Sequence, residues 1–310
     1  MPEPILHDRV PEVDRARVGI SYSGGGPLLL VELGIAQAFV DLGIRPYAIA
    51  GVSAGAIAAA AHAIDPVGGA GIRAAAKSLE QVSNRSLGLS VLQVAERAAW
   101  ERTHLMSLGS NESIQELLVV AFRDLAGSDR LTFDHFGRGG LPMLIVIATD
   151  RLTGEAVRFP GDADVAGALV ASSAIPGVFP PREMVLDGVK RLLVDGGVVN
   201  NQPLSVLALE GCGTMYACAV GYDGEQLQAP TNLIDNYLKA TSIGLHAAAR
   251  MEQAYVELRI GDAGVIHHVH PPVQELPVSG FDFTPEVIAT VVRDACDGTK
   301  RWIQEQRILP

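Results

Sequence analysis

Short apolar runs in the first part of the chain are each followed by a longer segment with helical spacing. Residues 17–23 and 47–52 are the first two runs, and each ends in a turn that contains glycine. Apolar residues then recur at helical spacing over 28–42 and 54–64. Two strand–turn–helix units in succession are typical of a parallel sheet covered by helices. We therefore expect an α/β fold of three layers, α/β/α, around a mainly parallel central sheet.

The second half of the chain continues with further strands and helices. Residues 143–149 are uniformly apolar and rich in β-branched side chains, which predicts a central strand buried on both faces. Asp187-Gly188 between two short runs predicts a hairpin. Further strands are expected at 214–220 and 267–270, and further helices at 164–174, 203–210, 231–258 and 285–306.

Residues 65–128 contain no clear strand and follow directly on the second helix. Their spacing predicts helices at about 72–82, 91–104 and 111–125. This helical insertion is either a lid over a site at the sheet edge or a packing layer, and the sequence favours neither.

A single domain is expected over residues 1–310, because no repeat, low-complexity segment or linker interrupts the chain. Within it, residues 17–220 would form the core that carries any catalytic site. Residues 221–310 would form a C-terminal helical extension, and the oligomeric state is left open.

The charge balance limits the partners. The sequence holds 24 Lys and Arg against 35 Asp and Glu, a formal net charge of -11. Nucleic acid is therefore not expected as a partner, because its binding needs a basic face. Strong electrostatic attraction to anionic membranes is disfavoured for the same reason, whereas peripheral apolar contact with a membrane stays open.

Cysteine usage and apolar run lengths indicate a cytoplasmic protein. The three cysteines, Cys212, Cys218 and Cys296, are odd in number and lack metal-ligand spacing, which is typical of reduced thiols. The polar N-terminus has no apolar signal segment, and no apolar run approaches the ~20 residues of a membrane span. We expect no metal ion and no cofactor.

The sequence Gly51-Val-Ser53-Ala-Gly55 lies between the second strand and the second helix. A serine on such a turn is exposed at the strand end, and the flanking glycines let strand and helix close together. The helix N-terminus stabilises negative charge that develops on the hydroxyl. The pattern predicts a nucleophile elbow with Ser53 as the nucleophile. His62 on the same helix lies roughly 13 Å along its axis and is out of reach as a base.

A second turn, Gly24-Gly25-Gly26, follows the first strand and should lie beside the Ser53 turn. Without side chains it can present several backbone N–H groups to one point, as an oxyanion hole requires. A dinucleotide fingerprint is disfavoured, because Leu29 stands where its last glycine is needed, and the P-loop pattern Gly-Lys-Ser/Thr is absent.

Two sets of residues could supply the base that activates Ser53. His267, His268 and His270 come late enough for the Ser–Asp–His order of α/β-hydrolases. Asp195 directly follows an apolar strand, and the two glycines after it permit a sharp turn. A carboxylate can serve as the base when a partly dry pocket raises its pKa. The residues alone leave both interpretations open.

Four blocks of the sequence resemble the patatin-like phospholipase family. They lie at 23–26, 51–56, 171–180 and 195–203, in the order that the family has, within residues 18–203. The resemblance implies the patatin-like fold and hydrolysis of lipid acyl esters. It also implies a Ser53–Asp195 catalytic dyad without histidine and an oxyanion hole at Gly24, Gly25 and Gly26.

One departure from the family pattern bears on the substrate. Where the family continues the glycine block with a small residue, a cation and a glycine, this sequence has Pro27-Leu28-Leu29. The loss of the cation shifts the expected substrate from phospholipid head groups toward a neutral or short-chain ester.

Together these patterns predict a serine hydrolase that cleaves carboxylic esters of lipids through an acyl-enzyme, like a phospholipase A, a lysophospholipase or an esterase. Two other interpretations stay open. One is an esterase with a Ser–Asp–His triad, and the other is a lipid-binding or regulatory protein with a weakened site. Transfer of the acyl group to an alcohol would use the same residues.

Overall fold

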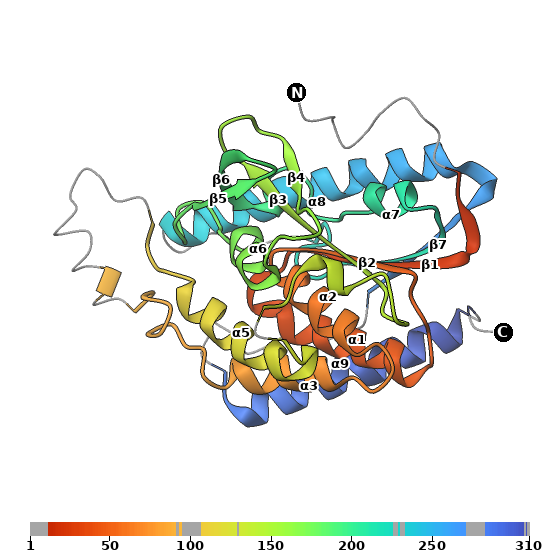
Figure 1. Cartoon of the computed structure of the whole chain (residues 1–310), viewed down its shortest axis with the longest axis horizontal. Coiled ribbons are helices and arrows are strands. Elements are labelled where there is room, and N and C mark those ends of the chain that lie inside the picture. The colour runs from red at the N-terminus through yellow and green to blue at the C-terminus, as the bar shows by residue number, and fades with distance from the viewer. Residues whose placement is uncertain are drawn as a thin grey trace.

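The computed structural model describes residues 12–90, 93–94, 107–128, 130–225, 229, 233–270, 283–306 and 308. Within these residues the chain forms an eight-stranded sheet with helices on both faces (Figure 1). The strands are β1 Asp14–Tyr22, β2 Ala48–Val52, β3 Met143–Asp150, β4 Ala156–Arg158, β5 Arg182–Leu186, β6 Val189–Asp195, β7 Cys212–Cys218 and β8 Val265–Val269.

Five neighbouring strands of the sheet run parallel, in the order β3-β2-β1-β7-β8. Beyond β3 the sheet continues with β6 and then β5, both in antiparallel pairing, and β4 also pairs antiparallel with β3. The mainly parallel sheet predicted from the sequence is confirmed. The predicted hairpin is β5–β6, and both of its turn residues, Asp187 and Gly188, have positive φ.

Helices form a layer on each face of the sheet, which confirms the three-layer arrangement (Figure 1). One layer holds α1 Leu29–Asp41, α2 Ala54–Ile64, α3 Ala70–Leu79, α5 Glu112–Ala126, α6 Val165–Ser172 and α9 Pro285–Glu305. The other holds α7 Ser205–Leu209 and α8 Leu233–Ile260. The short 3₁₀ helices are η1 Gly26–Leu28, η2 Phe133–His135, η3 Gly196–Val198 and η4 Gly261–Ala263.

The central strands are buried on both faces because alternate side chains enter the two cores. In β2, Ile49 packs into the core under α1 and α2, whereas Ala48 and Ala50 pack toward α7 and α8. Val146 and Ile147 of β3 divide between the two cores in the same way. Continuous apolar runs therefore predicted the central strands correctly.

Strand β1 begins at Asp14, three residues before the apolar run that predicted it. Its first four residues are exposed, so their side chains carry no apolar pattern. Backbone pairing holds them instead: Asp14 pairs with Cys212 of β7, and its N–H donates to the Gly211 carbonyl oxygen over 2.9 Å.

The helical insertion packs against the helix that follows Ser53. Helices α3 and α5 confirm two of its three predicted helices, and both contact α2. The third, expected at 91–104, lies almost wholly outside the described residues. After residue 220 the chain adds β8 to the sheet edge and packs α9 against α1.

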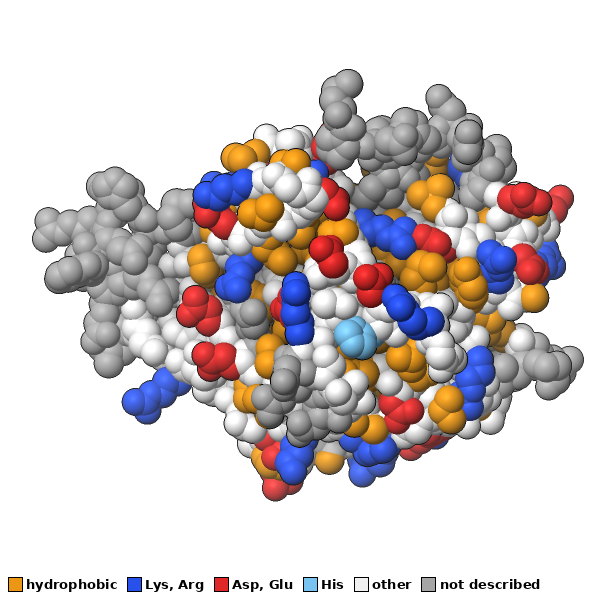
Figure 2. All heavy atoms as spheres, in the orientation of Figure 1, with side chains coloured by type: hydrophobic (Ala, Val, Ile, Leu, Met, Phe, Trp, Pro, Cys, Tyr) orange, Lys and Arg blue, Asp and Glu red, His pale blue; other side chains and the backbone are white. Residues whose placement is uncertain are grey.

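The described surface carries charges of both signs. On the face in Figure 2, acidic and basic side chains are interspersed among apolar ones and do not gather by sign. None of the helices in the described ranges is both long enough and apolar enough to cross a membrane.

A charged side chain is buried in the first helix. Glu32 of α1 has no exposed surface, and neither carboxyl oxygen has a hydrogen-bond partner among the described residues. Burial raises the pKa of this carboxyl well above its usual value. The unfolded chain therefore ionises Glu32 over a pH range in which the folded protein keeps it protonated.

We expect Glu32→Gln to stabilise the protein more at pH 8 than at pH 5. Because the folded pKa is raised, the wild type loses stability as the pH rises above the unfolded value of 4.5. The loss is about 1.4 kcal/mol for each unit of pKa difference, until the folded group also ionises. Urea denaturation at both pH values measures it, with the exposed Glu112→Gln as a charge-matched control. Equal gains at both pH values would contradict the assignment.

Candidate active site

Ser53 lies on a strained turn between β2 and α2. Its backbone has φ 54° and ψ -127°, a conformation that is uncommon for a residue other than glycine. A Cβ on Gly51 would lie 2.3 Å from the Gly55 carbonyl oxygen, and one on Gly55 would lie 2.3 Å from the Ser23 carbonyl oxygen. Close contact therefore requires both glycines, and the turn has the geometry that the elbow pattern predicts.

A buried serine holds this turn in place. The Ser53 backbone N–H donates to the Ser172 hydroxyl oxygen over 2.9 Å, and the Ser172 hydroxyl donates to the Ile147 carbonyl oxygen over 2.7 Å. Ser172 ends α6 and Ile147 belongs to β3, so two other elements are tied to the elbow. The sequence placed Ser172 only within a family-like block, because a contact between distant segments leaves no local pattern.

Asp195 reaches the Ser53 turn from the last residue of an antiparallel strand. Only the final residues of β6 pair with β3, and Asp195 lies opposite Ala148. On the other side of β3, Val52 at the end of β2 lies opposite Ile147. Ser53, the next residue, and Asp195 therefore flank the same point of β3 at the carboxyl edge of the parallel strands.

The turn after Asp195 crosses β3 at very close range. A Cβ on Gly196 would lie 2.1 Å from the Ile147 carbonyl oxygen and 2.4 Å from Val52 Cγ2. Any side chain at Gly196 would push this turn away from β2. The glycine that follows the acid is therefore what lets the carboxyl approach the elbow.

The Asp195 carboxyl is buried, and only one of its two oxygens accepts a hydrogen bond of good geometry. Oδ1 accepts from the Gly197 N–H over 2.8 Å, whereas Oδ2 has no hydrogen-bond partner of good geometry among the described residues. Desolvation raises the pKa of Asp195 to about 6, against the lowering effect of the Ser53 hydroxyl and the Gly197 N–H. The Ser53 hydroxyl thus lies close enough to act on the carboxyl, and this acid changes protonation near neutral pH.

The glycine turn lies directly against the elbow. A Cβ on Gly24 would lie 3.1 Å from the Ser53 Cβ. The Gly24 N–H donates to the Asn201 carbonyl oxygen over 3.3 Å, whereas those of Gly25 and Gly26 have no partner in the described part of the chain. Of the three amides predicted as oxyanion donors, that of Gly24 is therefore engaged by the Asn201 carbonyl oxygen.

The segment after Asp195 also holds the glycine turn. The Asn201 side-chain amide donates to the Gly24 carbonyl oxygen over 3.4 Å, and that of Gln202 donates to the Ser21 hydroxyl over 2.9 Å. The family-like block at 195–203 therefore carries the acid and also fixes the turn that faces it.

Ser53 borders a small cavity of about 40 Å³ with almost entirely apolar walls. The helical insertion contributes Leu79, Val82 and Ile114, so this segment forms part of the wall around the hydroxyl. Ser173 is also among the lining residues, and its hydroxyl oxygen is buried. The remaining walls come from Gly26, Leu29, Ala54, Ile57, Ile175, Phe179 and Phe283.

The late histidines lie at the far edge of the sheet. β8 is the third strand from β2, roughly 14 Å away at the usual strand spacing. His268 Nε2 lies 2.8 Å from Gln253 Nε2, and His267 packs against the Tyr216 ring. His268 and His270 border a separate cavity of about 370 Å³. The interpretation in which one of these histidines activates Ser53 is therefore wrong.

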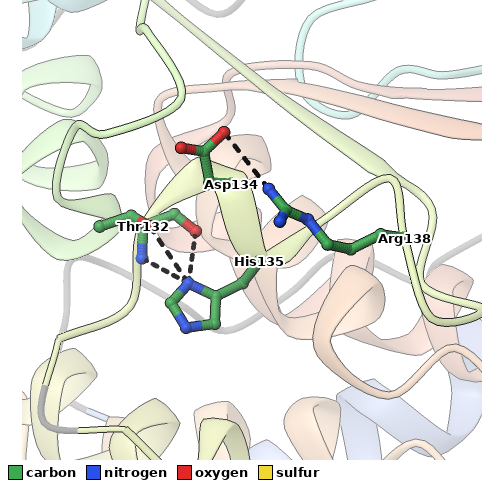
Figure 3. Close-up of polar contacts among 4 residues, drawn as sticks. All are labelled: Thr132, Asp134, His135 and Arg138. Atoms are coloured by element: carbon green, nitrogen blue, oxygen red, sulfur yellow. Dashed lines mark hydrogen bonds and ion pairs between the residues drawn. The ribbon is translucent and has the colours of Figure 1, made fainter.

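The other described histidines have local roles. His62 is fully buried, with Nδ1 2.9 Å from the Tyr22 hydroxyl oxygen. His246 borders the larger cavity near β8. His135 Nδ1 lies 3.1 Å from the Thr132 hydroxyl and caps η2 (Figure 3). In the same picture, Asp134 pairs with Arg138.

The sequence model of the patatin-like phospholipase family matches residues 20–208. NTE family proteins of Mycobacterium bovis and Mycobacterium tuberculosis are 28% identical to this chain over 199 residues, which is 63% of this chain and 29% of each relative. The chain therefore spans less than a third of the length of these relatives.

Solved structures resemble this chain over nearly its whole length. Human GIVD cytosolic phospholipase A2, in complex with methyl gamma-linolenyl fluorophosphonate and terbium chloride, is 12% identical with a TM-score of 0.50, over 96% of this chain and 60% of that one. VipD from Legionella pneumophila is 18% identical with a TM-score of 0.43, over 95% and 67%. At these identities the likeness to the human enzyme concerns the fold alone.

We expect Ser172→Ala to destabilise the protein by about 1–3 kcal/mol, because the buried Ser53 N–H loses its acceptor and the Ile147 carbonyl oxygen loses a donor. Urea denaturation measures the loss. Ser113→Ala, which removes a solvent-exposed hydrogen bond of 3.3 Å from the Ser113 hydroxyl to the Ser86 carbonyl oxygen, is the control and should change stability by less than about 0.5 kcal/mol. Equal stabilities for the two variants would show that Ser172 does not hold the elbow.

Proposed function

The chain belongs to the patatin-like phospholipase family, and from that premise we propose that it hydrolyses carboxylic esters of lipids through a Ser53–Asp195 dyad. The observation that carries the proposal is that the strained turn at Ser53 lies beside the buried carboxyl of Asp195. The Oδ2 atom of that carboxyl is open, and its pKa is about 6. Such a group is largely ionised at neutral pH and remains basic enough to accept a proton.

Acylation begins when Asp195 accepts the hydroxyl proton as Ser53 Oγ attacks the ester carbonyl carbon. The carbonyl electron pair moves onto oxygen, and the resulting oxyanion is held by the N–H groups of Gly25 and Gly26. The tetrahedral intermediate then collapses and the bond to the alcohol oxygen breaks. Asp195 returns the proton to the departing alcohol, which leaves an acyl group on Ser53.

Deacylation repeats the same steps with water. Asp195 accepts a proton from a water molecule as the water oxygen attacks the acyl carbon, and the same two amides hold the second oxyanion. Collapse breaks the bond to Ser53 Oγ, and the proton passes from Asp195 to that oxygen. The carboxylic acid leaves, and the serine and the carboxylate are restored. An alcohol in place of water would give acyl transfer at the same residues.

The surroundings of Ser53 favour a neutral ester with an apolar acyl group over a charged substrate. Leu29 lines the cavity at the position where the family pattern has its closing glycine. Apolar walls bind an acyl chain by removing its surface from water, at roughly 25 cal/mol per Å². They offer no counter-charge to a phosphate.

A fluorophosphonate probe tests the nucleophile. We expect robust labelling of the wild type, none of Ser53→Ala, and slower labelling of Asp195→Asn by about 10²–10⁴-fold, the usual contribution of a general base. Ester hydrolysis should fall in parallel. Ser113→Ala should label like the wild type. A folded wild type that takes no label would instead support the lipid-binding alternative.

The pH dependence tests the base. Asp195 must be ionised to accept the proton, so kcat/KM should rise with pH to a plateau, with a midpoint at about 6. The folded pKa of about 6 exceeds the unfolded pKa of 3.8. Above pH 6 this difference therefore lowers the free energy of unfolding by about 3 kcal/mol. Asp195→Asn should therefore be far less active than the wild type and yet more stable at pH 8. A destabilised variant, or a profile without this midpoint, would argue against the assignment.

A further inference from the structure

Asp195 lies next to a second cavity, which we call the acid cavity, in contrast to the serine cavity at Ser53. Val194, Val198 and Val199, which flank the acid on both sides in the sequence, line the acid cavity. None of these three valines lines the serine cavity. The acid cavity therefore lies on the Asp195 side of the site.

A short segment after α6 contributes to both cavities. Ile175 lines the serine cavity, Gly177 lines the acid cavity, and Phe179 lines both. The Asp195 backbone N–H donates to the Ala174 carbonyl oxygen of the same segment over 2.9 Å. The acid is therefore fixed to the segment that the two cavities share.

In the proposed hydrolysis, the two parts of an ester have different neighbours. The acyl group stays bonded to Ser53 Oγ after the alcohol has left, so its place is the serine cavity, which Ser53 lines. The departing alcohol oxygen takes a proton from Asp195 and must lie within about 2.6–3.2 Å of its carboxyl. From that oxygen the rest of the alcohol extends on the side of the acid, where the acid cavity lies.

Apolar side chains form the accessible walls of the acid cavity. Val198 is 51% exposed, and Val199 and Pro181 are half-buried. Contact with an apolar chain removes such surfaces from water, which favours binding. These walls therefore match a hydrocarbon chain.

The polar side chains along the acid cavity do not require a polar ligand. The Thr149 hydroxyl donates to the Asp195 carbonyl oxygen over 2.9 Å. Asp150 is buried, and its Oδ2 lies 3.1 Å from Arg191 Nη1. Arg151 is exposed, so water solvates its guanidinium group. The contacts that remain for a ligand are therefore mainly apolar.

We propose, building on the Ser53 hydrolase function, that the acid cavity binds the alcohol part of the ester and prefers a hydrocarbon chain there. The preferred substrates are then esters of apolar alcohols over esters of polar or charged ones. Val198 is a specificity residue: it contacts the alcohol chain and takes no part in proton transfer.

The test uses butyrate esters in which only the alcohol changes, from ethyl through propyl to butyl. We expect the wild-type kcat/KM, divided by the alkaline hydrolysis rate of each ester, to rise about fourfold for each methylene group that becomes buried. Val198→Ser, which replaces two methyl groups of the wall by a hydroxyl, should reduce this rise to about twofold or less. The wild type should also prefer the butyl ester over 2-methoxyethyl butyrate, which has a similar size and an ether oxygen.

Val189→Ser is the matched control. Val189 is 52% exposed, nearly the same as Val198, yet it lies at the start of β6 and lines neither cavity. This variant should keep the wild-type alcohol series. Val199→Ser changes the same wall as Val198→Ser and gives a second test if the first variant does not fold.

A series of acyl chains distinguishes the two cavities. Ethyl acetate, ethyl propionate and ethyl butyrate differ only in the acyl chain, and Val198→Ser should leave their relative rates as in the wild type. Ile114→Ala changes a half-buried wall of the serine cavity. It should flatten the acyl series and keep the alcohol series.

Three outcomes would overturn the proposal. The first is a wild-type alcohol series without a rise, and the second is a rise that Val198→Ser leaves unchanged. Either result would show that the acid cavity does not bind the alcohol. The third is a flattened acyl series in Val198→Ser, which would assign the acid cavity to the acyl chain.

A binding measurement separates this proposal from the hydrolase function. Butyl butyrate should raise the Tm of Ser53→Ala more than ethyl butyrate does, and Val198→Ser in the same background should reduce the difference. Selective binding without fluorophosphonate labelling of the wild type would overturn only the hydrolase. Labelling and hydrolysis without an alcohol preference would overturn only the role of the acid cavity.

Discussion

The site depends on holding the Asp195 carboxyl out of water beside Ser53. Burial alone would keep this acid neutral, and a neutral acid could not accept a proton. The Ser53 hydroxyl and the Gly197 N–H, which donates to Oδ1, partly offset the desolvation and leave the pKa at about 6. With Oδ1 engaged in this way, Oδ2 is the oxygen to which the proposed mechanism transfers the proton. The fold therefore gives up stability at neutral pH to keep the carboxylate that the proposed mechanism uses as its base.

Three turns must come together without intervening side chains for that arrangement to exist. Gly55 contacts the end of β1, Gly196 crosses β3 to reach β2, and Gly24 faces the Ser53 Cβ, each at a distance that leaves little or no room for a Cβ. Proteins pack closely enough that one misplaced methyl group moves backbone or side chains. The turns that follow β1, β2 and β6 can therefore come together only with glycine at these positions. For the same reason the site can be recognised in the sequence from its short glycine motifs.

Local patterns predicted most of the fold and part of the site. The runs 47–52 and 143–149 are apolar on both faces because both faces are covered, so their burial could be inferred from composition alone. The antiparallel direction of β6 relative to β3 could not be inferred, because an apolar strand pattern is the same in either direction. Ser172 was missed for a related reason: its bond to Ser53 joins residues 119 positions apart. The occupied amide of Gly24 likewise depends on Asn201, which lies far along the chain.

The apolar residues after the glycine turn act on two different sides of it. Leu29 lines the cavity at Ser53, whereas the Leu28 side chain lies 3.6 Å from the position of a Cβ on Gly221, which borders the larger cavity near β8. Leu28 stands where the family pattern has its cation. A cation there would face away from the cavity at Ser53, so its loss leaves the walls of that cavity and the Gly25 and Gly26 amides in place. The two leucines after the glycine turn therefore border different cavities.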